Sequence, residues 1–541
     1  MSEEICALTI AETAIEIERG SLSPVAVVEA SLAQVEKIGP SLDAFITLTA
    51  DTALSQARDA EAAIAKGNYL GPLHGIPFGL KDIYNTAGIL TTAHSRILID
   101  NVPDRDATTT AKLYEAGGIL LGKLATHEFA HGGPSFDLPW PLARNPWNTD
   151  YATGGSSSGS GAAVAAGLVK GAMGSDTGGS VRNPAGLCGI VGLKPTYGLV
   201  SRAGVIANSY TFDHCGPMTW TVEDAAIMLQ ALAGHDPADP ASAKVTPPDY
   251  RAALSGDIRG LRIGVIRHFW EEEMSANEEV CAAMEAALDT FRALGASVED
   301  ARMRPMQDYY DVKVTIAESE LFAIHATELQ TRPEDFGADF RGRVLPACLM
   351  SGADYANAQR ERRVMLTEME ALYEKYDVLL TAGVGPAGKL GNHQTVSFWQ
   401  KPSIATPFNV TGGPALAQCS GFSKNGLPLS LQIIGRPFDE ETVLRAADAY
   451  EKATPWRNAR PIVETARPLP KEAPQNPPSD IGDTERTEVA AAVARAGLKL
   501  SDTDFDQVCA AAPYVGAMVG RLRRKRGYGE EPGNTFTFPS R

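Results

Sequence analysis

Two glycine- and serine-rich segments lie close together in the sequence and constrain how this chain folds. The first, YATGGSSSGSGAAVAAG, covers residues 151–167, and the second, GSDTGGSVRNPAGLCGIVGLKPTYG, covers residues 174–198. One short apolar stretch, which predicts a helix at about 162–171, separates them. Glycines allow backbone N–H groups to approach a bound molecule closely. We therefore expect two loops that meet at the end of a sheet.

A flexible linker and a phosphate loop are alternative interpretations of the first segment. A linker is flanked by polar sequence, whereas residues 162–169 are apolar and helix-forming. A phosphate loop requires GxxxxGK followed by Ser or Thr, and this segment contains no lysine. Successive free N–H groups also form a concavity that binds developing negative charge, as acyl-transfer chemistry requires. This pattern favours an active site.

A third glycine-rich stretch, HGIPFGLKD, carries Lys81 in an otherwise apolar setting. Burial favours the neutral amine of a lysine, and a neutral lysine can act as a base. A serine, a lysine and a group of free N–H donors together make a hydrolase that needs neither histidine nor metal. The alternative is that the glycines only permit tight packing and that Lys81 lies on the surface.

Six motifs extend this pattern along the chain: LHGIPFGLKD, ARNPWN, GGSSSGSGAAVAAG, GSDTGGSVRNPAGLCGIVGLKPTYG, GPMTWTVEDAA and PFNVTGGPAL. Through these motifs, in this order, about residues 1–460 resemble the amidase signature hydrolases. The resemblance implies an α/β fold with a large, mixed and twisted sheet flanked by helices. One departure is Ser158, which stands where family members commonly have glycine and leaves the catalytic positions untouched.

The resemblance implies a Ser–cis-Ser–Lys triad in this chain. Ser180 in TGGSVR is the implied nucleophile, and Lys81 in GLKD is the implied terminal base. Ser156, the first serine of GGSSSG, is the implied bridging residue, with a cis peptide bond after Gly155. The resemblance further implies an oxyanion hole built from the N–H groups of Thr177, Gly178, Gly179 and Ser180. Asp176 and Arg182 are expected to brace this loop.

Substrate contacts are implied for residues that flank these loops. His131 and Gly132 are expected to line the pocket beside the nucleophile, together with Ser157. Candidates for an apolar wall are Phe129, Phe136, Trp140, Tyr210 and Phe212, although core packing explains any single aromatic residue equally well. His127 and His131 form only an HxxxH pattern, so we predict no metal and no cofactor.

The predicted function is hydrolysis of the carbon–nitrogen bond of a small amide substrate through an acyl-serine intermediate. One alternative is the A-type subunit of a tRNA-dependent amidotransferase, which works with partner subunits and tRNA. Another is a hydrolase of carbamates or urea derivatives, similar to carboxybiuret hydrolases. A non-catalytic binding module is disfavoured because all three triad positions are filled.

Composition restricts the partners and the compartment. The net charge of −17 argues against non-specific binding to nucleic acid or anionic membranes. The seven cysteines are scattered singly, so neither a disulfide framework nor a zinc site is predicted. The N-terminal MSEEICALTIAETAIEIERG has no basic start before an apolar core, and no apolar stretch approaches the ~20 residues of a membrane span. We expect a cytoplasmic protein with no nucleic-acid and no membrane partner.

Changes in sequence texture divide the chain into three parts. Residues 1–466 form the predicted catalytic unit, of which 1–66 are helical. Residues 467–482 are rich in proline and predict a stiff linker. Within the catalytic unit, further helices are predicted at 222–233, 275–294, 353–375 and about 439–452, and strands within 260–269 and 426–438.

Residues 483–541 are predicted to be a helical C-terminal extension. It faintly resembles the small C-subunit-type partners of some amidases, fused here to the catalytic unit. Two isolated helices cannot bury their apolar faces alone, so we expect the extension to pack on the body or to support a homodimer. The basic run Arg521, Arg523, Arg524, Lys525 and Arg526 is expected to be a solvated face, with docking against an acidic surface on the body or a partner as the alternative.

Overall fold

A mixed β-sheet runs through the middle of the computed structural model, which describes residues 2–391, 394–468 and 480–524. Within these residues the sheet has eleven strands: β1 Phe45–Leu48, β2 Pro77–Lys81, β3 Ile119–Leu124, β4 Gly171–Asp176, β5 Val191–Lys194, β6 His214–Thr219, β7 Arg262–Val265, β8 Ser297–Asp300, β9 Val378–Ala382, β10 Ala415–Phe422 and β11 Pro428–Gly435. Their order is β1-β3-β2-β4-β6-β5-β10-β11-β9-β7-β8. The predicted α/β fold with a large mixed sheet is confirmed.

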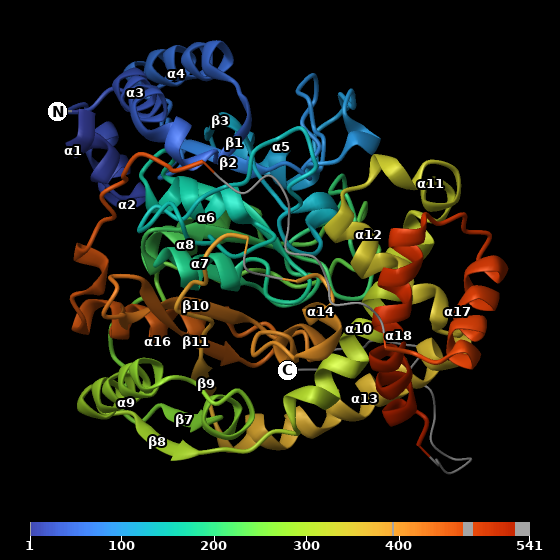
Figure 1. Cartoon of the computed structure of the whole chain (residues 1–541). Coiled ribbons are helices and arrows are strands. Elements are labelled where there is room, and N and C mark those ends of the chain that lie inside the picture. The colour runs from blue at the N-terminus through green and yellow to red at the C-terminus, as the bar shows by residue number, and fades with distance from the viewer. Residues whose placement is uncertain (1, 392–393, 469–479, 525–541) are drawn as a thin grey trace.

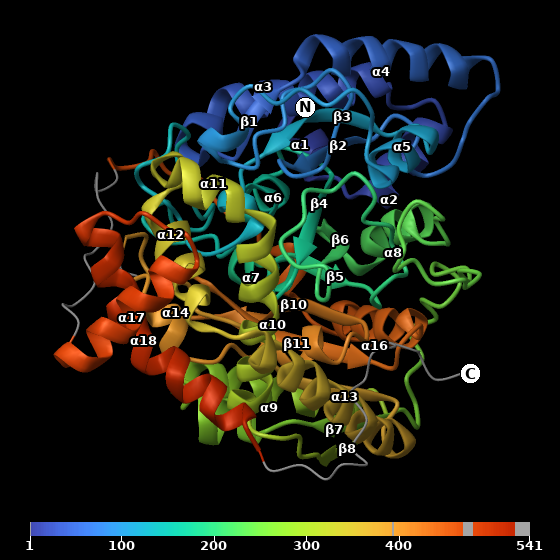
Figure 2. The ribbon, with the colours of Figure 1, turned by 90° about the vertical axis from the view of Figure 1, so that its right-hand side faces the viewer.

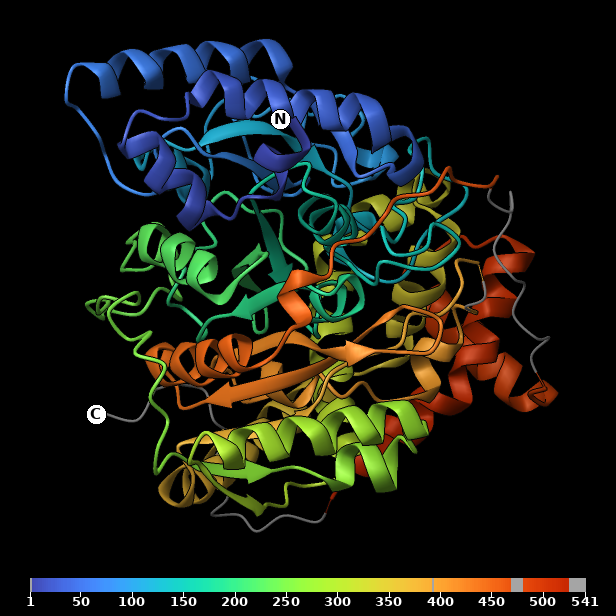
Figure 3. The same cartoon turned by 90° about the vertical axis from the view of Figure 1, so that its left-hand side faces the viewer.

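Helices flank this sheet along its whole length. They are α1 Ser2–Ala7, α2 Ile10–Glu18, α3 Pro24–Leu42, α4 Ala50–Ala65, α5 Thr108–Glu115, α6 Ser158–Ala165, α7 Arg182–Cys188, α8 Val222–Leu232, α9 Glu278–Ala293, α10 Met306–Ile324, α11 Ala326–Thr331, α12 Ala338–Val344, α13 Gly352–Lys375, α14 Ser397–Gln400, α15 Pro407–Val410, α16 Glu440–Ala453, α17 Asp483–Arg495 and α18 Asp502–Leu522. Figures 1 and 3 show α1–α4 at one end of the molecule and α9 with β7 and β8 at the other.

Strands β2 and β4 are parallel neighbours, and this pairing brings two of the glycine-rich motifs together. Leu80 of β2 lies opposite Met173 of β4, so the two strands end at the same edge, at Lys81 and Asp176. Every residue of both strands is buried. Helix α8 covers one face of β4, and residues near α6 and α7 cover the other, as the neighbours of Gly171 and Gly174 show. The loops that follow both strands therefore leave the sheet side by side.

The structure differs from the sequence predictions at several elements. Residues 45–48, within the segment predicted to be helical, form β1, because this short apolar run pairs with the edge of β3 in antiparallel fashion. The helix predicted at 162–171 begins earlier, at Ser158, and ends at Ala165, since the chain enters β4 at Gly171. Helix α10 was not predicted, because residues on all its sides are buried and it carries no one-sided apolar pattern.

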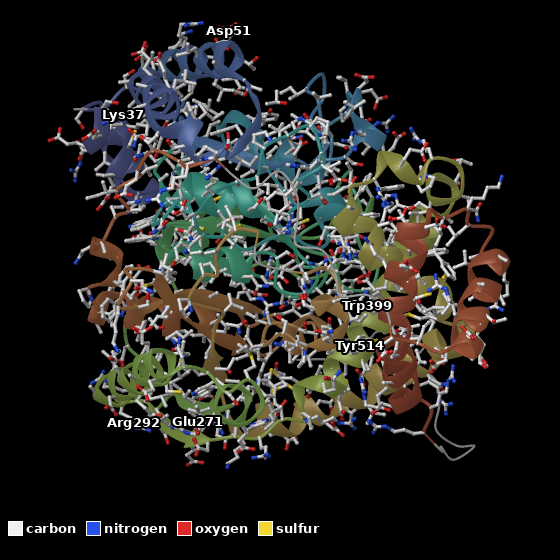
Figure 4. All side chains as sticks on the ribbon, viewed as in Figure 1. Lys37, Asp51, Glu271, Arg292, Trp399 and Tyr514 are labelled. Atoms are coloured by element: carbon white, nitrogen blue, oxygen red, sulfur yellow. The ribbon has the colours of Figure 1, made fainter. Side chains whose placement is uncertain are left out.

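The C-terminal extension packs on the body of the same chain. Helix α18 lies across α10, α12, α13 and α14, as Figures 1 and 2 show. Its apolar side chains join a buried cluster on the body, formed by Tyr310, Val314, Trp399, Ala511, Val515 and Met518. Tyr514 lies beside α14, where its hydroxyl accepts a hydrogen bond from Gln400 at 3.0 Å (Figure 4). The expectation of packing on the body is confirmed, whereas the homodimer stays a prediction.

Arginines at the end of α18 hold the extension in place. Arg521 Nη2 lies 2.7 Å from Asp311 Oδ1, and Arg523 Nε lies 2.8 Å from Asp354 Oδ1. Arg524 pairs with Glu361 at 3.2 Å. The side chains of Asp311 and Asp354 are only 1% exposed, so each buried carboxylate needs its guanidinium. These three arginines therefore dock against acidic groups of the body, which was the alternative, although their side chains stay about half-exposed.

Parts of three predictions lie outside the described residues, including residues 525–541 of the predicted helical extension. Of the predicted linker, residues 469–479 are not described, and the same holds for Lys525 and Arg526 of the basic run. Among the helices that the structure does describe, none is both long enough and apolar enough to cross a membrane.

We predict that Arg521→Ala combined with Arg523→Ala loosens α18 from the body. Two buried carboxylates lose their partners, but both arginines are half-exposed, so the cost is about 2 kcal/mol. Hydrogen exchange of the α18 amides should then accelerate by roughly 30-fold. The matched control is Arg292→Ala on α9, whose partner Asp289 is 76% exposed, and it should leave α18 unchanged. Equal exchange in both variants would contradict this role.

Candidate active site

Lys81 ends β2 in the interior of the protein. Its side chain is fully buried, so a surface position is excluded. Its Nζ donates to Ser156 Oγ at 2.6 Å and to Ser175 Oγ at 2.9 Å. Burial lowers the pKa of Lys81 to about 7, although the negative charges of Asp213 and Asp176 oppose this shift. A large fraction of this amine is therefore neutral near neutral pH, as a base requires.

Ser156 lies in the loop that precedes α6, and its peptide bond with Gly155 is cis. The carbonyl oxygen of Ser156 accepts hydrogen bonds from His127 N at 3.0 Å and from Ser158 N at 2.8 Å. Gly155 packs so tightly on His127 that a β-carbon there would lie 2.1 Å from Cε1 of the ring. No other residue fits at this position, and Ser156 is thereby held against the lysine.

The turn from β4 to α7 presents Ser180 and is organised by Asp176. Its carboxylate accepts hydrogen bonds from Gly179 N at 2.7 Å and from Arg182 Nε at 3.0 Å. Asn409 of α15 donates to the same carboxylate at 2.8 Å. Burial alone would raise the pKa of Asp176, but Arg182 holds it well below its usual value. Asp176 is therefore a permanent anion, and Ser180 remains partly exposed at the apex of the turn it closes.

The N–H of Gly179 donates to Asp176, so the predicted oxyanion hole has fewer free donors than expected. A donor already bonded to a carboxylate is not free to bind a developing oxyanion. The N–H groups of Thr177, Gly178 and Ser180 have no hydrogen-bond acceptor within the described part of the chain. The predicted set of four donors is thus reduced to these three. Gly179 itself has a φ of +119°, which requires glycine.

Two of the predicted substrate contacts, Ser157 and Phe129, make internal contacts that hold the fold together. Ser157 is fully buried, and its Oγ accepts from Ser175 N at 3.2 Å, so it ties its loop to β4. Phe129 is 2% exposed and packs in an aromatic cluster with His325, Phe336 and Phe340. Both predictions are corrected, because neither side chain is accessible to a substrate.

The other predicted contacts are distributed around the site. His131 Nε2 lies 3.2 Å from Glu318 Oε2, in a buried pair that the sequence did not signal. Gly132 accepts a hydrogen bond from His127 Nδ1, and a β-carbon on Gly132 would lie 2.7 Å from Asp339. Tyr210 is 61% exposed. Phe212 is fully buried and belongs to the hydrophobic core.

One cavity adjoins the loop that carries Ser156, and a second adjoins the end of β4. One, of about 330 Å³, is lined by residues that include His94, His127, Gly154, Ser158 and Arg343. The other, of about 310 Å³, is lined by residues that include Ser175, Tyr210, Asp213 and His214. Ser175 also accepts a hydrogen bond from Lys81, so one residue that lines the second cavity contacts the lysine. Ser175 is a site residue that sequence reasoning missed, although it lies inside the GSDTGGS motif.

The two histidines of the HxxxH pattern have different neighbours. His127 Nδ1 is engaged by the Gly132 carbonyl, and burial lowers the pKa of His127 to about 3. His131 instead faces Glu318. Among the described residues, no group of three or more His, Cys, Asp or Glu side chains is arranged to hold a metal ion.

Comparison with known proteins identifies the family. The model of the family described as Amidase matches residues 26–444. The chain belongs to the Amidase family. It is 41% identical over 485 residues to the A-type subunit of the glutamyl-tRNA(Gln) amidotransferase from Geobacter metallireducens, a match that covers 84% of this chain and 99% of that relative. Members of this family act on amide carbon–nitrogen bonds, so the predicted resemblance to the amidase signature hydrolases is confirmed.

Solved structures of the Amidase family superpose on the chain. A structure described as a vestigial protein complex that reveals the evolutionary origins of an s-triazine catabolic enzyme has a TM-score of 0.77 at 32% identity. That match covers 82% of this chain and 98% of the other. Native peptide amidase from Stenotrophomonas maltophilia has a TM-score of 0.73 at 30% identity, and the match covers 84% of this chain and 99% of the other.

We predict that Asp176→Asn strongly destabilises the protein. The substitution leaves Arg182, which is 1% exposed, as a buried charge without its counterion. The expected loss in the free energy of unfolding is about 3–5 kcal/mol, measured by chemical denaturation. Asp377→Asn is the matched control, since its partner Arg262 is 47% exposed, and it should cost less than about 1 kcal/mol. A similar loss in both variants would show that the Asp176 pair has no special role.

Proposed function

We propose that this chain hydrolyses the carbon–nitrogen bond of a small amide, with Ser180 as nucleophile, Ser156 as relay and Lys81 as base. The observation that carries the proposal is the 2.6 Å contact between Lys81 Nζ and Ser156 Oγ, made by a lysine whose pKa is about 7. A buried amine with so low a pKa next to a serine hydroxyl is poised for proton transfer.

The reaction proceeds in two halves. Ser180 Oγ forms a bond to the amide carbon while its proton passes to Ser156, which gives its own proton to Lys81. The N–H groups of Thr177, Gly178 and Ser180 stabilise the oxyanion of the tetrahedral intermediate. When the carbon–nitrogen bond breaks, the same relay returns the proton to the leaving amine or ammonia. Water then attacks the acyl-Ser180 ester, which releases the acid and restores the serine.

Cavity size supports a small substrate. The cavities of about 330 and 310 Å³ lie at the lower end of the range for small-molecule sites. The second is lined by Asp213, His214 and Ser175, and Ser175 contacts the lysine. Carbamates and urea derivatives have the same carbonyl-to-nitrogen bond and remain alternative substrates. A cytoplasmic location and a homodimer also remain predictions.

The curated relatives favour a second candidate, the A-type subunit of a tRNA-dependent amidotransferase. The relative from Geobacter metallireducens carries that name, and this chain matches 99% of its length. In that case the chemistry of Ser180 would be the same, but partner subunits and tRNA would be needed, and the expected absence of a nucleic-acid partner would be wrong. The extension argues for an independent enzyme, because α17 and α18 already occupy one face of the body.

The test is acylation and turnover by the purified chain alone. The wild type should release ammonia or amine from simple amides, and a fluorophosphonate should add its mass at Ser180. Ser180→Ala should lower kcat by about 10⁴-fold or more and abolish labelling, because the nucleophile is lost. The control Ser255→Ala replaces an exposed serine and should change neither.

Two results would decide against this proposal. Labelling of another serine, with Ser180→Ala still active, would overturn the nucleophile. A labelled but inert wild type that releases ammonia only after amidotransferase partner subunits are added would establish the second candidate.

We predict that activity rises with pH as Lys81 loses its proton, with an apparent pKa of about 7. Asp213 raises the pKa of Lys81 through its negative charge, so Asp213→Asn should move this acid limb to lower pH. The measurement is kcat/KM, or the rate of phosphonate labelling, as a function of pH. Asp257→Asn, at an exposed surface pair, should leave the limb in place. A limb that moves to higher pH in Asp213→Asn would contradict Lys81 as the titrating group.

A further inference from the structure

A second lysine reaches the turn that carries Ser180. Lys313 of α10 lies so close to this turn that a β-carbon on Gly178 would lie 3.2 Å from Lys313 Cε and 3.7 Å from its Nζ. Its side chain is 8% exposed. The N–H of Gly178 is one of the three free donors of the turn. The ammonium of Lys313 is therefore a neighbour of the position where the amide carbonyl would bind.

The partners of Lys313 leave its hydrogen-bonding capacity unused. Glu318 Oε1 lies 3.7 Å from Nζ, beyond hydrogen-bond distance, and the ring of Phe398 has its centroid 5.8 Å away. Within the described residues, no hydrogen bond reaches Lys313 Nζ. An ammonium has three donors, so a bound molecule can satisfy those that the protein does not.

The positive groups around Lys313 do not each have a carboxylate of their own. Burial would raise the pKa of Glu318, but His131, Lys313 and Arg343 hold it below its usual value, so Glu318 is an anion. This one carboxylate faces both Lys313 and His131. Arg343 has its own counterion, Asp339, at 2.8 Å. Lys313 is thus the cation of this group with the weakest compensation.

Helix α10 is firmly held around this lysine. Asp311, two residues earlier, is clamped by Arg521 of the extension. Tyr310 donates a hydrogen bond to the carbonyl of Phe398, and α18 packs behind both elements. The backbone that carries Lys313 is therefore held in place beside the turn, so a ligand there need not order the helix.

We propose that Lys313 binds a carboxylate carried by the substrate close to its scissile amide, and so selects amides of short dicarboxylic acids. This inference rests on the proposed function, and it names the substrate class of the same site. Lys313 acts here as a specificity-determining residue, whereas bond cleavage belongs to Ser180, Ser156 and Lys81.

The experiment compares a charged amide with a neutral one of the same shape, succinamate with butanamide. In Lys313→Met, kcat/KM for succinamate should fall about 10–100-fold, mainly through KM, because a charge-assisted contact is lost. Butanamide should be affected less than about threefold. Lys313→Arg should restore part of the succinamate activity. Lys66→Met, at an exposed position, is the matched control and should change neither substrate.

Protection of Ser180 provides a second readout that does not depend on turnover. Succinamate should slow fluorophosphonate labelling of Ser180 in the wild type but not in Lys313→Met. An equal loss for both amides would overturn the inference, since Lys313 would then serve the oxyanion or the fold. Absence of any change in Lys313→Met would overturn it as well.

Failure of the inference is distinguishable from failure of the proposed function. If Ser180 is labelled but succinamate does not protect it in the wild type, the inference is wrong and the proposed nucleophile stands. If Ser180 is not labelled at all, the proposed function is overturned, and this inference is overturned with it.

Discussion

The ion pair between Asp176 and Arg182 is the interaction on which the architecture of the site depends. Arg182 also donates to the Ala405 carbonyl and to Gln432 Oε1, each at 2.9 Å, and to Asn409. Strand β4, helix α7, the segment around α15 and strand β11 therefore converge on one buried guanidinium. Because a buried charge is tolerated only when it is paired, this network holds the Ser180 turn in one conformation.

Burial disfavours a charge at Lys81 as it does at Asp176, but among the described residues Lys81 has no buried counterion in contact and tends to lose its charge. Asp176 keeps its charge because Arg182 compensates it, whereas Lys81 meets mainly two serine hydroxyls. Burial therefore lowers the pKa of Lys81, and the more distant charges of Asp213 and Asp176 limit the shift to a value near 7. Two neighbouring parallel strands thus end in a permanent anion and a lysine that readily loses its proton.

The C-terminal extension is connected to the site through α10. This helix pairs with Arg521 through Asp311 and carries Lys313 to the Ser180 turn, with Glu318 beside the lysine. Helix α18 also packs behind Phe398, which lies near Lys313. The extension therefore supports one wall of the site from outside, and it contributes none of the three proposed catalytic residues.

The sequence alone determined the fold class and most helices, because apolar periodicity and the order of the motifs carry this information. The glycine and serine motifs singled out Lys81, Ser156 and Ser180 as the proposed triad. For the extension, the amphipathic helices required a partner surface but left open whether it was the body or a second copy. Only the tertiary structure decided which groups are free to act. It assigned the N–H of Gly179 to Asp176, and it buried Ser157 and Phe129. It also revealed Lys313, whose helix is covered on all sides and shows no periodicity. Lys313 meets Gly178 across more than a hundred residues of chain, and such contacts depend on packing rather than on local pattern.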